Sequence, residues 1–135
     1  MKKTLPFPVE NIADMLFSPA LQWGNLILFP GTLPNLEGKN LKSPFVGDQF
    51  RQIIRKMEDS LKKCGLTFDD LLIVIILLKD MEDYDEINEI YSLIMKKNGG
   101  EVDLMPVRAC FAVADLPFHA KVEVFYIAGK PGKLK

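Results

Sequence analysis

Apolar residues recur at helical spacing in two segments of the chain. In the first segment the apolar positions lie three or four residues apart: Val46, Phe50, Ile53, Ile54, Met57 and Leu61. This spacing predicts a helix with one buried face, which Gly65 ends in a left-handed conformation. A second helix is predicted with Asp83 as its N-cap and Asn98 at its end. Its apolar face is Ile87, Ile90, Tyr91, Ile94 and Met95.

Four apolar stretches are predicted strands. They cover residues 25–31, 71–78, 107–114 and 120–129, and the loop at 32–44 could add a weak edge strand. The order β-β-α-β-α-β-β predicts an α+β fold, a two-layer sandwich of one mixed β-sheet packed on two helices. The whole chain, 1–135, is expected to form a single domain, with a short, basic and mobile tail at 130–135.

The predicted strands are apolar on both faces, most clearly in the run "LLIVIILL" at 71–78. Such a strand is typical of a sheet that is covered on both sides. Two helices can cover only one side, and the other would expose apolar surface on the order of several hundred Å². We therefore expect oligomerisation. The run is also far shorter than the about 20 residues of a membrane helix, so no membrane span is predicted.

Charge and cysteine usage exclude several classes of partner. The chain has 17 basic and 18 acidic residues and a net charge of -1, which argues against nucleic acid as a partner. Cys64 and Cys110 have neither metal-ligand nor redox spacing, and no signal-peptide pattern stands at the N-terminus. These features predict a cytoplasmic protein with free thiols and no bound metal.

One charged residue, Arg108, stands in the otherwise apolar strand "PVRACFAVADLP". Alternate strand residues share a face, so Arg108 and Cys110 point the same way. If this strand neighbours the last one, Arg108 and Glu123 could also share a face. They could then form a partly buried ion pair with a structural role only. Alternatively, Arg108 binds a ligand carboxylate and Glu123 positions or deprotonates water.

Three other polar residues have plainer interpretations. Cys110 is predicted to be a small core residue, because no His or Lys near it in sequence would activate the thiol. His119, the only histidine, is predicted to be a solvated turn residue. Asn88 interrupts the apolar face of the second helix, where it is either solvated or hydrogen-bonded towards an end of the sheet.

The segment "PVRACFAVADLPFHAKVEVFYIAG" resembles the C-terminal signature of the RidA (YjgF) family of reactive intermediate deaminases, also called the endoribonuclease L-PSP family. In that signature a proline is followed by an arginine, a cysteine two positions later, a Leu-Pro turn and a strand that contains glutamate. The stretches "GNLILFPGTLP" and "CGLTFDDLLIVIILLKDMEDYDEINEIY" also look like family blocks. Together they extend the resemblance over most of residues 24–128.

The resemblance implies a chorismate-mutase-like fold assembled as a homotrimer, with three clefts between subunits. It implies hydrolysis of reactive enamine and imine acids, such as 2-aminoacrylate, to 2-oxo acids and ammonia without a cofactor. By position, Arg108 would grip the substrate carboxylate and Glu123 would be associated with the attacking water. Gly31, Asn88 and Cys110 would line the pocket.

Two positions depart from the family pattern. A tyrosine in an early Gly-Pro-Tyr loop corresponds to Ala20, and the serine before the pocket glycine corresponds to Pro30. The missing phenol and hydroxyl are expected to weaken turnover, and the vacated space to favour bulkier, more apolar imino acids. Two alternatives remain: an endoribonuclease that inhibits translation, and a non-catalytic trimer that binds a carboxylate ligand.

Overall fold

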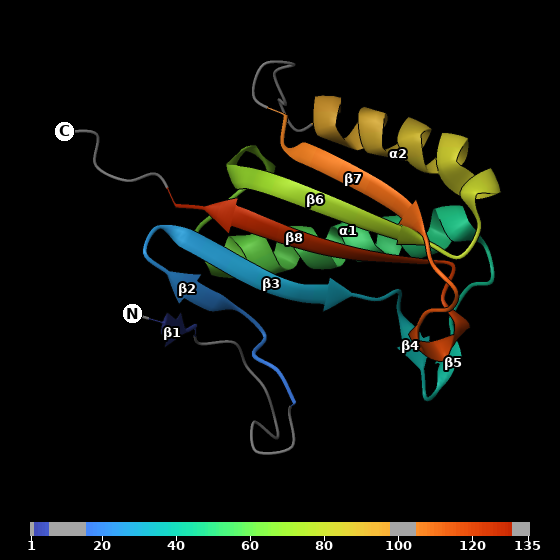
Figure 1. Ribbon diagram of the computed structural model, residues 1–135, viewed down its shortest axis with the longest axis horizontal. Helices are drawn as coiled ribbons and strands as arrows, with labels where there is room; N and C mark the ends of the chain where they lie inside the picture. The colour runs from blue at the N-terminus through green and yellow to red at the C-terminus, as the bar shows by residue number, and fades with distance from the viewer. Residues whose placement is uncertain (1, 6–15, 98–104, 131–135) are drawn as a thin grey trace.

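The structure is a computed structural model that describes residues 2–5, 16–97 and 105–130 (Figure 1). It contains a mixed sheet of six strands with two helices on one side of it, so the α+β prediction is confirmed. The strand order is β1-β2-β3-β8-β6-β7. The bounds are β1 Lys2–Thr4, β2 Leu21–Trp23, β3 Leu26–Thr32, β6 Leu71–Leu78, β7 Val107–Ala112 and β8 Val122–Gly129.

Strand pairing differs from the prediction in two places. The short strands β1 and β2 were not expected, and they extend the sheet beyond β3. The weak strand expected in the 32–44 loop is instead a separate hairpin of β4, Leu36–Glu37, and β5, Asn40–Leu41. Gly38 supplies its turn with a positive φ of 65°. Among the described strands, only β6 and β7 pair in parallel, because α2 carries the chain back between them.

The helices begin and end close to the predicted positions. Helix α1 spans Val46–Lys63, and Gly65 follows with the left-handed φ of 74° that was predicted. Helix α2 spans Tyr84–Lys97. The predicted N-cap Asp83 belongs instead to a 3₁₀ turn, η3 at Met81–Asp83, capped by the Asp80 carboxylate, which accepts from the Glu82 N–H. The predicted end at Asn98 lies outside the described residues, and so does the predicted tail at 130–135 apart from Lys130.

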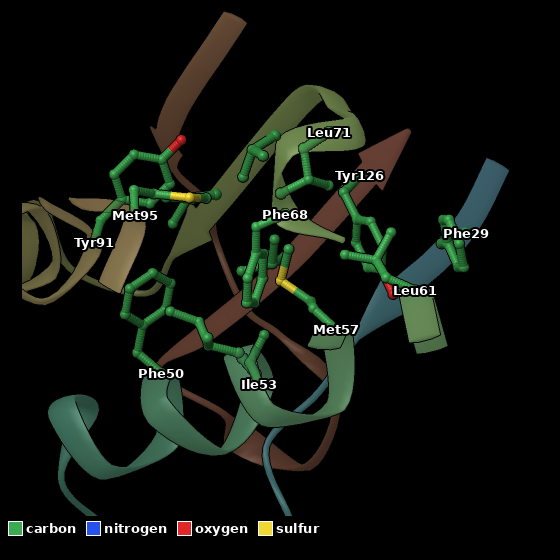
Figure 2. Close-up of a cluster of buried hydrophobic side chains, with 14 of the residues drawn as sticks. Phe29, Phe50, Ile53, Met57, Leu61, Phe68, Leu71, Tyr91, Met95 and Tyr126 are labelled. Carbon is green, nitrogen blue, oxygen red and sulfur yellow. The ribbon is translucent and has the colours of Figure 1, made fainter. Parts of the chain in front are cut away.

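The hydrophobic core lies between the helices and the sheet face towards them (Figure 2). Figure 2 labels Phe29, Phe50, Ile53, Met57, Leu61, Phe68, Leu71, Tyr91, Met95 and Tyr126. The Phe29 and Tyr126 rings stack with centroids 4.5 Å apart. Burying each large side chain stabilises the fold by about 1.5–3 kcal/mol, so this single core explains the two-layer arrangement.

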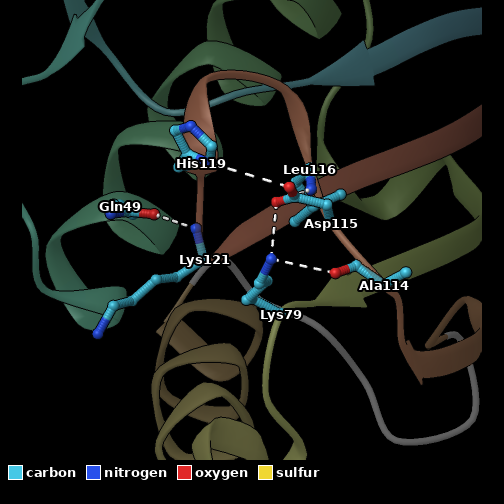
Figure 3. Close-up of polar contacts among 7 residues, drawn as sticks. All are labelled: Gln49, Lys79, Ala114, Asp115, Leu116, His119 and Lys121. Carbon is cyan, nitrogen blue, oxygen red and sulfur yellow. Dashed lines mark hydrogen bonds and ion pairs between the residues drawn. The ribbon is translucent and has the colours of Figure 1, made fainter.

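Polar contacts fix the end of the sheet where β8 begins (Figure 3). The buried Gln49 of α1 accepts from the Lys121 N–H at 2.8 Å and donates to the Ser43 carbonyl at 2.9 Å. Lys79 forms an ion pair with Asp115 at 2.7 Å. These contacts tie α1, β6 and the turn before β8 together.

The opposite face of the sheet has no cover among the described elements. By register, Leu26, Val107 and Phe111 lie on this face, and they are 42%, 66% and 52% exposed. We call it the open face. Its apolar character agrees with the expectation of an oligomer, whose trimeric form stays a prediction. In the described part of the chain, no helix is long and apolar enough to cross a membrane.

Candidate functional site

Arg108 projects from the edge strand β7 towards helix α2. In the parallel pairing of β6 and β7, Arg108 lies beside Val74 and Cys110 beside Ile76. Val74 and Ile76 are buried under the helices, so Arg108 and Cys110 occupy the helix side of the sheet. The arginine is half-buried there.

Three residues of α2 hold the Arg108 guanidinium. Its Nη2 donates to Asn88 Oδ1 at 2.6 Å and to the Tyr84 hydroxyl at 3.4 Å. The guanidinium carbon lies 4.9 Å from the centroid of the Tyr91 ring and 5.8 Å from that of Tyr84. Each such cation–π contact contributes about 0.5–2 kcal/mol. Residues 84, 88 and 91 share one face of the helix, which therefore presents Arg108 in a fixed orientation.

Arg108 has no carboxylate partner among the described residues. The ion pairs found there are those of Asp115 with Lys79 and with His119. Both hydrogen bonds of Arg108 leave from Nη2, so Nε and Nη1 bond to no described group. A half-buried cation is normally paired. This unpaired edge of the guanidinium has the two-donor geometry that binds a carboxylate.

Glu123 lies on the open face, on the other side of the sheet from Arg108. It pairs with Leu77 of β6, and β6 separates β8 from β7. The expectation that Arg108 and Glu123 share a face, which assumed neighbouring strands, is therefore wrong. Arg108 lies beside Val74 on the helix side of β6, and Glu123 lies beside Leu77 on the open face. The alternative of an Arg108–Glu123 ion pair within one chain is excluded for the same reason.

The Glu123 carboxylate is half-buried beside Gly31. Burial raises the pKa of Glu123 above its usual value, and no hydrogen bond or ion pair holds the carboxylate in the described structure. A Cβ on residue 31 would overlap the Glu123 Oε2 atom. Gly31 is thus required for the close approach of the carboxylate. The five predicted site residues fall into two groups, with Asn88, Arg108 and Cys110 on the helix side and Gly31 and Glu123 on the open face.

Cys110 has the environment of a packing residue. It is half-buried against the core, and burial raises the pKa of its thiol even though the nearby Arg108 cation acts to lower it. The thiol therefore remains protonated near neutral pH. A protonated thiol is a poor nucleophile, which agrees with the predicted role of Cys110 as a small residue lining the site.

The two departures from the family pattern lie in different places. Ala20 is fully buried and belongs to the core, so it does not line the open face. The expected preference for bulkier imino acids stays a prediction. Pro30 is half-buried, immediately before Gly31. His119 is a solvated turn residue, as predicted, with its side chain 90% exposed and 3.9 Å from Asp115.

Sequence reasoning missed the two tyrosines that surround Arg108. Tyr84 and Tyr91 carry a detectable signal, because they stand four residues before and three residues after Asn88 and so lie on its face of the helix. Tyr91 was assigned to the core alone. No group of three or more His, Cys, Asp or Glu side chains in the described ranges could hold a metal ion.

Comparisons with known proteins place this site in a family context. The family model described as Endoribonuclease L-PSP matches residues 10–130. Reactive Intermediate Deaminase A, chloroplastic, of Arabidopsis thaliana is 31% identical over 113 residues, covering 83% of this chain and 57% of that protein. The 2-iminobutanoate/2-iminopropanoate deaminase of Homo sapiens is 32% identical over 88 residues, covering 65% of this chain and 60% of that protein. Both matches span less than two thirds of the relative.

Solved structures have the same fold. The solution structure of HI0719 from Haemophilus influenzae has a TM-score of 0.83 and 26% identity, covering 97% of this chain and 99% of that one. The crystal structure of the YjgF gene product of E. coli has a TM-score of 0.80 and 24% identity, covering 96% and 99%. Since the family model and the curated relatives agree with the fold, this chain belongs to the RidA (YjgF) family, also described as Endoribonuclease L-PSP.

Proposed function

We propose that this protein hydrolyses reactive enamine and imine acids to 2-oxo acids and ammonia, at sites formed between the subunits of a homotrimer. The observation that carries the proposal is the pre-oriented edge of the Arg108 guanidinium, Nε and Nη1, which bonds to no described group. The names of the Arabidopsis and human relatives support the reaction class. The proposed compartment is the cytoplasm, and neither a metal nor a cofactor takes part.

The proposed site needs residues from two chains. Within one chain, Arg108 and Glu123 lie on opposite sides of the sheet and two strand spacings apart, or about 10 Å. A small substrate held by Arg108 of one subunit would meet the Glu123 of a neighbouring subunit. The apolar open face supplies the surface for such an assembly.

The proposed mechanism uses the electrophilic carbon of the imine. Arg108 binds the substrate carboxylate and so orients the C=N bond. Glu123 accepts a proton from water as the water oxygen bonds to the imine carbon. It passes this proton to the nitrogen, which gives a carbinolamine. Glu123 then carries the hydroxyl proton of the carbinolamine to the nitrogen as the carbonyl forms, the C–N bond breaks and ammonia leaves. The raised pKa of Glu123 suits a group that both accepts and donates a proton.

The test is an ammonia-release assay on purified wild type and the Arg108→Ala variant. Imines are generated in the assay by an amino-acid oxidase, or as 2-aminoacrylate by a pyridoxal-phosphate enzyme. Arg55→Ala is the matched control, because Arg55 is an exposed arginine on α1. Turnover by wild type and Arg55→Ala, with loss in Arg108→Ala, supports the proposal. Unchanged turnover in a folded Arg108→Ala variant contradicts it.

Two other functions are tested on the same purified proteins by two further assays, 2-oxo acid binding and RNA cleavage. If no imine is hydrolysed while a 2-oxo acid still binds in an Arg108-dependent manner, the protein is a carboxylate-binding trimer. The missing hydroxyl at Pro30 favours this second candidate. Cleavage of a defined RNA without metal would support the endoribonuclease activity that the family description names.

A further inference from the structure

Helix α1 carries three polar residues at a spacing of four: Gln52, Lys56 and Ser60. They lie along one side of the helix. Gln52 and Lys56 bond to the backbone of residues 33–35, and Ser60 interacts with Tyr126, which also interacts with Thr32. We propose that Lys56 is a positioning residue, which with Gln52 and Ser60 fixes residues 32–35 and so keeps Gly31 next to the Glu123 carboxylate. The catalytic part of this inference rests on the proposed function, whereas the positioning part does not.

The backbone near Gly31 needs support because strand pairing lapses there. Phe29 pairs with Tyr126 and Thr32 with Val124, but the register shifts between them. Pro30 lacks a backbone N–H, so it cannot donate to β8. After Thr32 the strand ends. The backbone around Gly31 therefore depends on contacts made by side chains.

Lys56 and Gln52 make those contacts on the segment that follows. The Lys56 ammonium donates to the carbonyl of Leu33 at 2.8 Å and to that of Pro34 at 3.3 Å. The Gln52 Oε1 atom accepts from the Asn35 N–H at 2.9 Å. Two side chains one helical turn apart thus bond to three consecutive residues.

Ser60 acts at the start of the segment through a tyrosine of β8. The buried Tyr126 hydroxyl interacts with the side chains of Ser60 and Thr32, and burial raises the pKa of Tyr126 to about 12. The hydroxyl thus keeps its proton at physiological pH. Thr32 directly follows Gly31 and ends the stretch over which the strand register shifts, so this interaction fixes the backbone next to Gly31.

Lys56 differs from the ordinary surface lysines of α1. It is half-buried, and burial lowers the pKa of its ammonium. Partial burial of a cation is unfavourable unless acceptors replace its water, and the two carbonyl oxygens do so. By contrast, Lys62 lies exposed near the end of the same helix. Removing the Lys56 ammonium would leave both carbonyls without this donor, and residues 33–34 free to move away from the helix.

The test compares Lys56→Met, which keeps a long side chain without the charge, with Lys56→Arg and the exposed control Lys62→Met. The first readout is the titration of the Glu123 carboxyl carbon by NMR in each folded oligomer. In Lys56→Met, water reaches the carboxylate and its pKa falls by about half a unit or more. Lys62→Met is expected to match wild type, and Lys56→Arg to restore most of the wild-type value.

The second readout is turnover of an imine. In Lys56→Met, kcat is expected to fall by about tenfold with a smaller change in KM, because Arg108 still holds the carboxylate. An unchanged Glu123 titration in folded Lys56→Met overturns the inference. If wild type hydrolyses no imine, the titration alone decides the inference, so the two failures are distinguishable. Should Lys56→Met not fold, Gln52→Leu removes the acceptor for Asn35 and is expected to shift the titration in the same direction.

Discussion

The two sides of the sheet carry opposite charges that are held differently, a fixed cation on one side and a carboxylate without bonding partners in the described structure on the other. On the helix side, Arg108 is held by two hydrogen bonds and two aromatic rings, yet it has no anion among the described residues. On the open face, Glu123 has no bonding partner in the described structure, and burial raises its pKa. Two charges that served only the fold would be expected to neutralise each other. The sheet separates them and leaves each without an ion-pair partner among the described residues, which agrees with the proposed role of each at a site between subunits.

The largest expected effect is on ligand binding and comes from removing the Arg108 cation. Arg108→Ala should weaken binding of a 2-oxo acid by about thirtyfold or more, since removing one partner of a buried charge pair costs about 2–5 kcal/mol. Isothermal titration calorimetry with pyruvate measures this loss, and light scattering checks that the oligomer survives. Equal affinity in variant and wild type would assign Arg108 to structure alone.

On the open face, Gly31→Ala tests the close approach of Glu123. The new Cβ would overlap the carboxylate oxygen, so the side chain or the strand must shift. Because the overlapping atom is the end of a flexible side chain that can turn away, the loss of stability should be at the low end of overpacking, about 1 kcal/mol or less. Turnover should fall because the carboxylate is displaced. Urea unfolding and the ammonia-release assay measure the two effects. A variant with wild-type stability and turnover would show that the contact is unimportant.

The sequence predicts the elements on the two sides of the sheet better than it predicts how the strands are ordered. Periodicity located both helices and the long strands, since burial on one face imposes the spacing. The capping signal was less exact, because Asp83 belongs to a 3₁₀ turn before α2. The strands β1 and β2 were missed because a strand of three residues is too short to show an alternation of apolar and polar positions. Arg108 and Glu123 were placed correctly by parity within their strands, but a turn between β7 and β8 suggested neighbours. The connection from β7 to β8 instead passes over β6, which lies between them in the sheet. No local sequence pattern shows which strand lies between two others.

A smaller effect is expected on stability when Glu123 loses its charge. The pKa of Glu123 is higher in the folded than in the unfolded state. The protonated carboxyl therefore favours the folded state at low pH, and this stability is lost as the pH rises from the unfolded through the folded pKa. Glu123→Gln should therefore stabilise the protein at pH 7 by less than about 1 kcal/mol, because the group is partly solvated. The gain should disappear near pH 4. Urea unfolding of both proteins at the two pH values measures it, and a gain independent of pH would contradict the assignment.

The smallest effect is expected at the turn before β8, outside both groups of site residues. Phe118 and His119 both have a φ of 59°, a left-handed conformation that non-glycine residues adopt at some cost. His119→Gly should relieve part of that cost and stabilise by up to about 1 kcal/mol. Thermal unfolding measures the gain, and turnover should stay unchanged. A destabilised variant would show that the His119 side chain contributes more than its exposure suggests.

The measurement that tests the intersubunit site most directly is complementation between two inactive variants. Arg108→Ala and Glu123→Gln are each purified, unfolded together in equal amounts, refolded and assayed for ammonia release. If each site takes Arg108 from one chain and Glu123 from another, random mixing in a closed trimer makes about one quarter of the sites complete. The account predicts recovery to about that fraction of wild-type activity. Mixed trimers without activity, beside a wild type that refolds to full activity, would contradict it.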